Sequence, residues 1–325
     1  MTTPASNLPT SAFFRLEQLG EGIHHAVATP GSGSLGNAGI IDLGDRTLIF
    51  DTMMTSAAAR DLRAAAERLT GRAPRYVVNS HLHIDHTMGN GVFEEATIFA
   101  TTATAALIAN ENEAFLRELR EHGTEMDAKA RAEAAAVSDP AVRLDMEQQN
   151  DDYLALLREA SQTRSRPPDV TFESRLTIHG ARRQAQLISW GGGHTPSDAV
   201  LYLPTERIML TGDLIFYRCH ASIDRGDPAE WLRILGEMER LDVATVAPGH
   251  GEVTSKSAFA EQRSYLEAML ARALQKVEAG ETDEQIAATP LPAEYRDYGF
   301  ASGFAQTLQA LATYQRARTS GDERA

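Results

Sequence analysis

The sequence predicts a mixed α/β (α+β) protein built from two sets of strands with helices around them. Short apolar runs separated by turn residues fill most of the first hundred residues, which is the pattern of strands. A second set of such runs lies between residues 170 and 246. Stretches in which apolar residues recur at helical spacing interrupt, separate and follow the two sets. Hydrophobic residues make up 42% of the 325 residues, so the chain can bury a sizeable core in one large domain or two ordinary ones.

One helix interrupts the first set of strands. Gly44 begins a hairpin signal between two of these strands. Ser56 is the expected cap of a helix that runs through an alanine-rich stretch to about residue 69, and Gly71 ends it. A short buried strand at 76–78 follows and leads directly into a cluster of histidines. The other expected strands of this set lie at residues 22–28, 38–43 and 47–50.

Residues 103–166 differ in character from the strands on either side. This stretch is rich in Ala, Glu, Arg and Leu, and Ile108, Phe115 and Leu119 recur at helical spacing. The segment 165–168, with two prolines, ends it. We therefore expect an insert of two or three helices between strands. Two roles stay open for this helical insert, a solvated decoration of the domain or a lid or dimer surface.

Helices lie within and after the second set of strands. Asp227 and Pro228 begin a helix whose apolar positions form one face. After Gly251 the chain is expected to be helical again, with Gly280 as a C-cap and Thr282 beginning a further helix through a capping box. The expected strands of the second set lie at residues 170–178, 184–190, 199–203, 207–210 and 243–246.

The composition argues against several classes of function. The net charge of −14, from 31 basic and 45 acidic residues, is unlike that of a nucleic-acid binder, because such proteins need basic patches. The N-terminal segment has no basic stretch followed by an apolar run, and no segment reads as a membrane span. We therefore expect no nucleic-acid partner, no membrane association and a cytoplasmic location. Cys219 is the single cysteine, which excludes an intrachain disulfide and a thiolate metal cluster.

Four side chains with metal-binding groups lie within six residues after the strand at 76–78. His81 and His83 point to the same side of an extended chain, because side chains alternate along it, so both rings can bind one metal ion. Asp85 and His86 follow on a turn and can reach a second metal ion nearby. This run is the strongest functional signal in the sequence.

Three further metal-binding side chains follow later strands. His194 lies after three glycines, Asp213 after a Thr-Gly pair, and His250 in a Pro-Gly-His-Gly segment. Each alone is a weak signal, since such residues are common in loops and turns. Together with the first run they supply five histidines and two aspartates, which suit zinc and also manganese or iron.

These motifs closely resemble those of the metallo-β-lactamase superfamily, in the same order and over roughly residues 22–253. The motifs are HLHIDH (81–86), GGGHTPSD (191–198), TGD (211–213) and PGHG (248–251). The resemblance implies a four-layer αβ/βα sandwich, with two sheets face to face, helices outside and two zinc ions, or manganese or iron, at one sheet edge. The ligands it implies are His81, His83 and His194 for one metal, Asp85, His86 and His250 for the other, and Asp213 bridging both.

The same resemblance suggests a division of the chain and a set of supporting residues. Residues 1–255 form the expected metallo-β-lactamase-fold domain with its insert, and residues 256–325 form a C-terminal helical extension packed on the same domain. Asp51 matches an early aspartate of the family and is expected to fix a loop or a ligand histidine. Ser197 and Asp198 are candidates for orienting His194. We expect His220 at the surface or in a cap, with a place facing the substrate as the alternative.

The resemblance and the metal chemistry together predict a hydrolase. Two metal ions can hold a hydroxide between them at neutral pH, which attacks an acyl or phosphoryl compound, while Asp85 or Asp213 moves the proton. Many β-lactamases of the superfamily have Cys or Ser where this chain has Asp213, whereas thioesterases, lactonases and phosphodiesterases have Asp. The leading expectation is therefore a small ester, lactone, thioester or lactam as substrate.

Alternatives from other classes stay open at this stage. Relatives of the same fold include dioxygenases of thiols or persulfides that load one iron at His81, His83, His194 and Asp213. A β-lactamase, a phosphodiesterase and a non-catalytic binding module are further alternatives, although the last usually loses metal ligands. The expected partner is a small molecule, and the exposed helical additions leave room for a homodimer.

Overall fold

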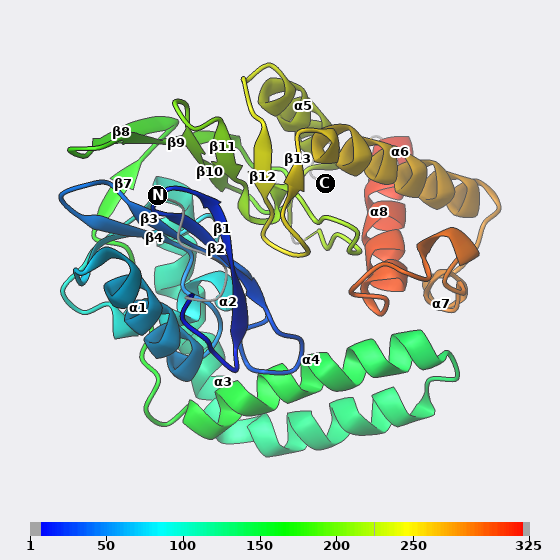
Figure 1. The fold of residues 1–325 in the computed structure, drawn as a ribbon. Coiled ribbons are helices and arrows are strands. Elements are labelled where there is room, and N and C mark those ends of the chain that lie inside the picture. The colour runs from blue at the N-terminus through cyan, green and yellow to red at the C-terminus, as the bar shows by residue number, and fades with distance from the viewer. Residues whose placement is uncertain (1–7, 224, 321–325) are drawn as a thin grey trace.

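Two β-sheets lie face to face at the centre of the molecule (Figure 1). The computed structural model describes residues 8–223 and 225–320. Within these residues the first sheet has seven strands, which are neighbours in chain order. They are β1 (Phe14–Gly20), β2 (Ile23–Ala28), β3 (Ala38–Asp42), β4 (Thr47–Phe50), β5 (Pro74–Val78), β6 (Thr97–Thr101) and β7 (Val170–Phe172). The second sheet, in the order β13-β12-β11-β10-β9-β8, contains β8 (Arg175–His179), β9 (Gln184–Gly191), β10 (Asp198–Leu203), β11 (Ile208–Leu210), β12 (Thr245–Ala247) and β13 (Thr254–Ser255).

Apolar side chains on the facing surfaces of the two sheets form a shared core. Because residues alternate between the two faces of a strand, Ile41 and Leu48 point toward the second sheet. Their neighbours Ile40 and Ile49 point to the opposite face. Leu201 of β10 contributes to the shared core from the second sheet. All five side chains are fully buried, and burial of each stabilises the fold by about 1.5–3 kcal/mol.

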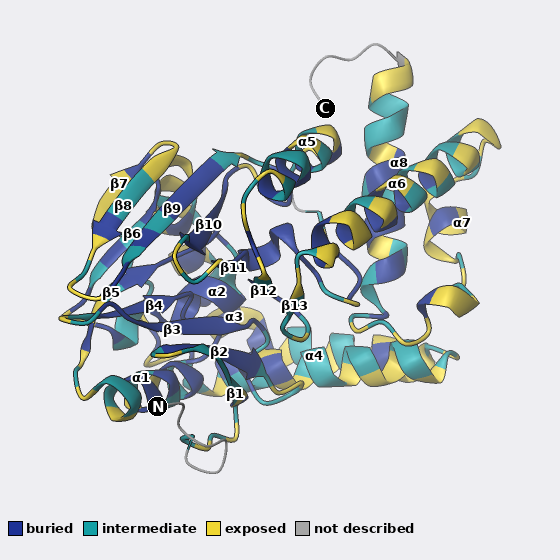
Figure 2. Ribbon diagram, turned by 45° about the horizontal axis from the view of Figure 1, so that its top comes forward, coloured by how far each residue is buried: buried dark blue, intermediate teal, exposed yellow. Residues whose placement is uncertain are grey.

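Helices cover the outer face of each sheet. Helix α1 (Ser56–Thr70) packs its alanine-rich face on the first sheet. Helices α5 (Pro228–Glu239), α6 (Ser257–Glu278) and α8 (Gly303–Ser320) share an apolar cluster with the second sheet. The layers are therefore helix, sheet, sheet and helices, with the buried residues between them (Figure 2). This four-layer arrangement confirms the fold class predicted from the sequence.

The stretch expected to be a helical insert contains two helices that run side by side. They are α3 (Thr102–Ala136) and α4 (Pro140–Glu159), and they lie below the sheets in Figure 1. Leu116 and Leu156 of these helices pack on Met54 and Met88. Met88 lies two residues after the ligand candidate His86, and Met54 lies three residues after Asp51. The carboxylate of Asp152 also accepts hydrogen bonds from the backbone of the loop that precedes β3. These contacts fix the helical insert beside the edge where the motifs meet.

Among the C-terminal helices, α7 (Asp283–Ala287) begins at its expected capping box, and Gly280 follows Ala279, the C-cap of α6. The N–H of Gln285 donates to the Thr282 hydroxyl at 3.3 Å and the N–H of Thr282 donates to the Gln285 side chain at 2.8 Å, which is the expected capping box before α7. Gly280 has a φ of +73°, as a residue that ends a helix often does. A short 3₁₀ helix, η4 (Ala293–Tyr295), precedes α8. Ser302 then donates its N–H and hydroxyl to Asp145, which ties this segment to α4.

The structure corrects three details of the sequence prediction. Thr55, not Ser56, caps α1, because the Thr55 hydroxyl accepts from the N–H of Ala58 at 3.2 Å. The single strand expected at 170–178 is two strands, β7 and β8, and the chain crosses from one sheet to the other between them. Strands β1 and β6 were not expected. The half-buried β1 lies at an edge of its sheet and lacks a clear apolar run.

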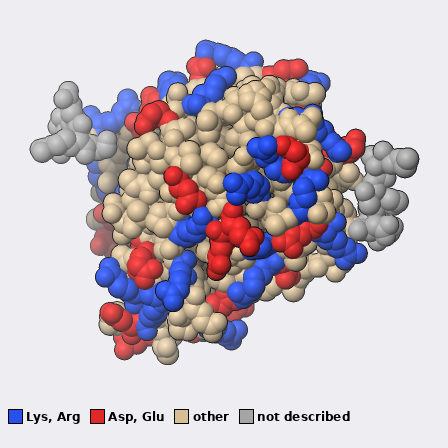
Figure 3. Space-filling model, turned by 90° about the vertical axis from the view of Figure 1, so that its left-hand side faces the viewer, with Lys and Arg blue, Asp and Glu red and all other residues tan. Residues whose placement is uncertain are grey.

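The surface carries charges of both signs. On the face drawn in Figure 3, acidic and basic side chains are interspersed. Many described arginines pair with a carboxylate, as Arg63 does with Glu67 at 3.0 Å. Exposed pairs of this kind contribute about 0–1 kcal/mol each. Among the described helices, none is long and apolar enough to cross a membrane.

Candidate metal centre

The residues of the four motifs meet at one edge of the two sheets. The segment that follows β5 carries His81 and His83, and His83 has the extended backbone expected for it, with φ −61° and ψ 146°. Asp85 and His86 lie on the short helix α2 (Ile84–Thr87). From the second sheet, the loop between β9 and β10 carries His194, the 3₁₀ helix η3 (Gly212–Leu214) carries Asp213, and the loop after β12 carries His250.

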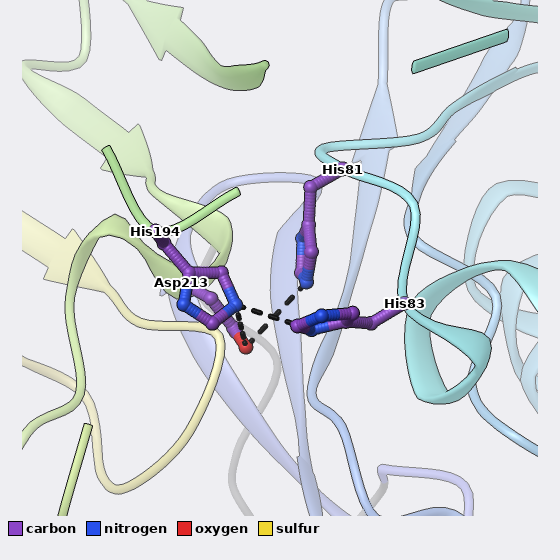
Figure 4. A group of neighbouring side chains, drawn as sticks. All are labelled: His81, His83, His194 and Asp213. Atoms are coloured by element: carbon purple, nitrogen blue, oxygen red, sulfur yellow. Dashed lines mark hydrogen bonds and ion pairs between the residues drawn. The ribbon is translucent and has the colours of Figure 1, made fainter. Parts of the chain in front are cut away.

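The first group of possible metal ligands is His81, His83, His194 and Asp213 (Figure 4). Their ligand atoms all lie within 4.8 Å of one another. The Nε2 atom of His194 is 3.1 Å from Nδ1 of His83 and 3.3 Å from the Asp213 carboxylate. The side chains come from both sheets and point to one position between them.

The second group is Asp85, His86 and His250. The Nε2 atoms of His86 and His250 are 3.4 Å apart, and the Asp85 carboxylate is 3.1 Å from the first and 3.3 Å from the second. All three side chains are buried, and Asp85 is 7% exposed. This group therefore provides two nitrogens and one carboxylate.

Asp213 lies between the two groups. One of its oxygens is 3.2 Å from Nε2 of His86, and the other is 3.2 Å from Nε2 of His250 and 3.3 Å from that of His194. A Cβ at Gly249 would lie 2.0 Å from the Asp213 carboxylate, so the glycine of the PGHG motif allows this close approach. One carboxylate thus contacts histidines of both groups.

This donor set fits metal ions. Imidazole nitrogens and carboxylate oxygens are the ligands that zinc, manganese and iron take in proteins. The Nε2 atom of His81 is buried without a hydrogen-bond partner within the described residues. Burial holds the pKa of His81 well below its ordinary value, so its ring is neutral and has a free lone pair. A bound cation would accept the lone pairs of ring nitrogens that otherwise face one another, such as Nε2 of His86 and of His250.

The charges of the two groups are strongly coupled. Burial opposes the charged form of Asp213, but His250, His86 and His81 outweigh it and hold its pKa well below the ordinary value. Burial likewise opposes protonation of His250, but Asp213 raises the pKa of that ring to about 9. Protons on histidines therefore balance the buried carboxylates wherever a metal ion does not.

Asp51 contacts His86 directly and His81 through Ser80, so it supports a residue of each group. It follows β4 and adopts a left-handed backbone, with φ +61°. Its carboxylate accepts from the N–H and the hydroxyl of Ser80, both at 2.8 Å, and lies 3.1 Å from Nδ1 of His86. The Ser80 hydroxyl is in turn 2.8 Å from Nδ1 of His81. The structure thus places Asp51 where it fixes the orientation of His86 directly and that of His81 through Ser80.

The two residues expected to orient His194 have different surroundings. Asp198 accepts from the backbone N–H groups of Gly193 and His194 at 2.8 and 3.0 Å, so it holds the loop rather than the ring. The hydroxyl of Ser197 bonds to Thr101 at 2.7 Å instead of to His194. The partner of the ring itself is the carbonyl oxygen of Ser222, 2.8 Å from Nδ1. No motif in the sequence indicates Ser222, because it contributes only a backbone atom.

A cavity of about 430 Å³ opens onto both groups. His83, Asp85, Asp213 and His250 line it from the metal-ligand groups. The helical insert contributes Glu111, Asn112, Phe115, Gln149 and Tyr153, and the C-terminal segment contributes Phe300, Ser302, Gly303 and Gln306. His220 also lines the cavity and is 2% exposed, which corrects the expectation that it lies at the surface or in a cap.

Comparison with known families agrees with this geometry. The model of the metallo-beta-lactamase superfamily matches residues 31–250. The chain therefore belongs to the metallo-beta-lactamase superfamily. The matched range begins before β3 and ends at His250, so it contains all seven metal-ligand candidates. No match was found among curated protein sequences.

Solved structures show the same fold at low sequence identity. A metallo-beta-lactamase from Pontibacter korlensis is 16% identical, with a TM-score of 0.58 over 78% of this chain and 99% of that one. The DIM-1 metallo-beta-lactamase is 17% identical, with a TM-score of 0.54 over 79% of this chain and 98% of that one. The inverting sec-alkylsulfatase Pisa1 from Pseudomonas sp. is 18% identical, with a TM-score of 0.63 over 93% of this chain and 50% of that one. At these identities the likeness shows the fold alone.

Proposed function

We propose that the protein is a metal-dependent hydrolase that cleaves a small ester, lactone, thioester or lactam. The observation that carries the proposal is the position of Asp213, whose carboxylate contacts histidines of both ligand groups at the edge of one cavity. Membership of the superfamily supports a hydrolytic reaction. The aspartate at this position also favours an ester, lactone or thioester over a β-lactam as the native substrate.

Each ligand group would hold one metal ion, with zinc as the proposed metal and manganese or iron as alternatives. The first ion would bind His81, His83 and His194, the second would bind Asp85, His86 and His250, and Asp213 would bridge them. When bound, two such ions lower the pKa of water to near neutrality and polarise the bond under attack.

The side chains of the centre have separate tasks in the proposed reaction. Burial opposes the charged form of Asp85, but His86 and His250 outweigh it and keep its pKa well below the ordinary value. Its carboxylate is therefore ionised, lines the cavity and can take a proton from the attacking water and return it to the leaving group. Phe115 and Phe300 give the cavity apolar walls that exclude water from the reacting groups.

Two substitutions test this proposal. We expect His83→Ala and Asp213→Ala to abolish hydrolysis of a panel of lactone, thioester, β-lactam and phosphodiester substrates while circular dichroism shows a retained fold. His179→Ala is a matched control, because His179 is exposed on β8 and does not line the cavity. Turnover retained in both variants, with metal still bound, would contradict the proposal.

A further inference from the structure

The inner face of α3 carries polar side chains as well as apolar ones. Thr104, Ile108 and Asn112 follow one another at intervals of four residues, so they lie on the same face of the helix. All three are buried, with exposed fractions of 0–2%. A buried threonine or asparagine has given up its contacts with water, so its hydrogen bonds within the protein show what the helix is attached to.

Asn112 is connected to the segment that carries His83. Its Nδ2 atom is 2.9 Å from Oγ1 of Thr87. The Thr87 hydroxyl is in turn 2.9 Å from the carbonyl oxygen of His83 and 3.3 Å from that of Leu82. The hydroxyl has one hydrogen, which these carbonyls can only accept, so it accepts in turn from the Asn112 amide. The amide therefore directs the Thr87 hydrogen toward the backbone of the ligand segment.

Thr104 is connected to the loop that carries His194. Its hydroxyl donates to the carbonyl oxygen of Ser197 at 2.9 Å. The hydroxyl of Thr101, which caps α3, is 2.9 Å from that of Thr104 and 2.7 Å from that of Ser197. The three hydroxyls and the Ser197 carbonyl form a closed ring in which each hydroxyl can donate once. This ring attaches the start of α3 to the loop between β9 and β10.

The loop can transmit this contact to His194 because a carboxylate holds it together. Asp198 accepts from the backbone N–H groups of residues 193–195 at 2.8–3.2 Å. A shift of Ser197, the neighbour of Asp198, would therefore move the backbone of His194 with it. The contacts of α3 thus reach the first ligand group from both sheets, since His83 follows a strand of the first and His194 a strand of the second.

We propose that α3 braces the first ligand group through two positioning residues. Asn112 restrains the segment that carries His83. Thr104 restrains the loop that carries His194, and the helix between the two contacts sets the distance between these ligands. This inference rests on the proposed function, because it concerns the metal ion that the first group would bind.

Zinc affinities of the single ligand groups test the inference on the full chain. His250→Ala leaves all four side chains of the first group in place, and His81→Ala leaves the second group, so each background reports on one site. Competition with a chromophoric chelator measures the affinity. In the His250→Ala background we expect Thr104→Val and Asn112→Leu each to weaken zinc binding by about tenfold, the lower end of the range for residues that support metal ligands. In the His81→Ala background the same changes should have a smaller effect.

Matched variants separate positioning from packing. Thr104→Ser keeps the hydroxyl and should keep the zinc affinity. Ile108→Val removes one methylene group from the same buried face, so it should lower stability and leave zinc binding unchanged. Val and Leu resemble Thr and Asn in shape, and circular dichroism verifies that each variant is folded. A merely structural role of α3 predicts that Thr104→Val behaves as Ile108→Val does.

Cobalt in place of zinc gives a readout that does not depend on affinity. The visible absorption of bound cobalt responds to the arrangement of its ligands, so the spectrum should change in Thr104→Val and not in Ile108→Val. Unchanged zinc affinity in both Thr104→Val and Asn112→Leu would overturn the inference. If the wild type binds two zinc ions but hydrolyses no ester, the proposed function fails, and the zinc affinities still decide the role of α3.

Discussion

Replacing Asp51 by Asn tests how one buried carboxylate supports the candidate metal centre. The backbone of residue 51 has φ +61°, a conformation that Asn tolerates well, so the loop should keep its path. In the wild-type protein the Asp51 carboxylate accepts from the N–H and the hydroxyl of Ser80, and it lies 3.1 Å from Nδ1 of His86. Asn offers one oxygen and one NH₂ group to these three donors, so at least one contact becomes donor against donor.

The size of the effect follows from these contacts. A hydrogen bond to a charged group contributes about 1.5–3 kcal/mol, and loss of such support for a metal ligand typically weakens metal binding about 10- to 100-fold. Because Asp51 contacts His86 directly but reaches His81 only through Ser80, the metal at Asp85, His86 and His250 should weaken most. The other metal should change by much less.

Competition with a chromophoric chelator measures both affinities in the variant. Asp198→Asn is the matched control, because Asp198 holds the backbone of the His194 loop and should weaken the first ligand group instead. A folded Asp51→Asn protein with two unchanged metal affinities would refute the idea that Asp51 orients the ligands. Equal weakening of both metals by each variant would refute the division into two groups.

Three further results are expected. Burial opposes protonation of His86, but the carboxylates of Asp85 and Asp213 keep its pKa well above the ordinary value. Metal uptake at pH 7 should therefore release protons, which calorimetry in two buffers of different ionisation enthalpy measures. Uptake without proton release would contradict this expectation. Burial lowers the pKa of His220 to about 4, so this histidine is protonated in the unfolded chain at a higher pH than in the folded protein. The free energy of unfolding should therefore fall by up to about 3 kcal/mol as the pH drops from about 6.5 to about 4. Denaturant titrations should show a shallower loss in His220→Phe, and an identical pH profile would count against the burial argument. Trp231 is fully buried and its indole N–H donates to a backbone carbonyl, so Trp231→Ala should cost about 3–5 kcal/mol of unfolding free energy; a cost below about 1 kcal/mol would show that the layer relaxes around the gap.

The sequence predicted the residues that meet at the sheet edge better than it predicted their supports. His81 and His83 lie in a short local motif at the end of a buried strand, and such ends converge in this fold. Asp51 was expected because it also follows a strand. Ser222 was missed because it acts through its backbone carbonyl oxygen, which every residue type has.

The cavity and part of the fold depend on contacts between distant segments. His220 was placed at the surface or in a cap, because nothing near it in sequence shows that Tyr265 and the C-terminal segment enclose it. The turn at 173–174, where the chain passes from one sheet to the other, was also not predicted, because the residues around it have the pattern of one continuous strand. The four-layer fold itself was predictable, because its strands and helices carry the periodicity that their burial requires.

Metal content measured together with turnover shows whether the protein is a hydrolase with two metal ions. The chain is loaded stepwise with zinc, the bound metal is counted by mass spectrometry of the native protein, and hydrolysis of p-nitrophenyl esters is followed at each step. We expect two metal ions per chain, with hydrolysis that rises as the second ion binds and is lost in Asp213→Ala. One iron per chain with oxygen consumption on a thiol substrate, and no hydrolysis at full zinc loading, would contradict it.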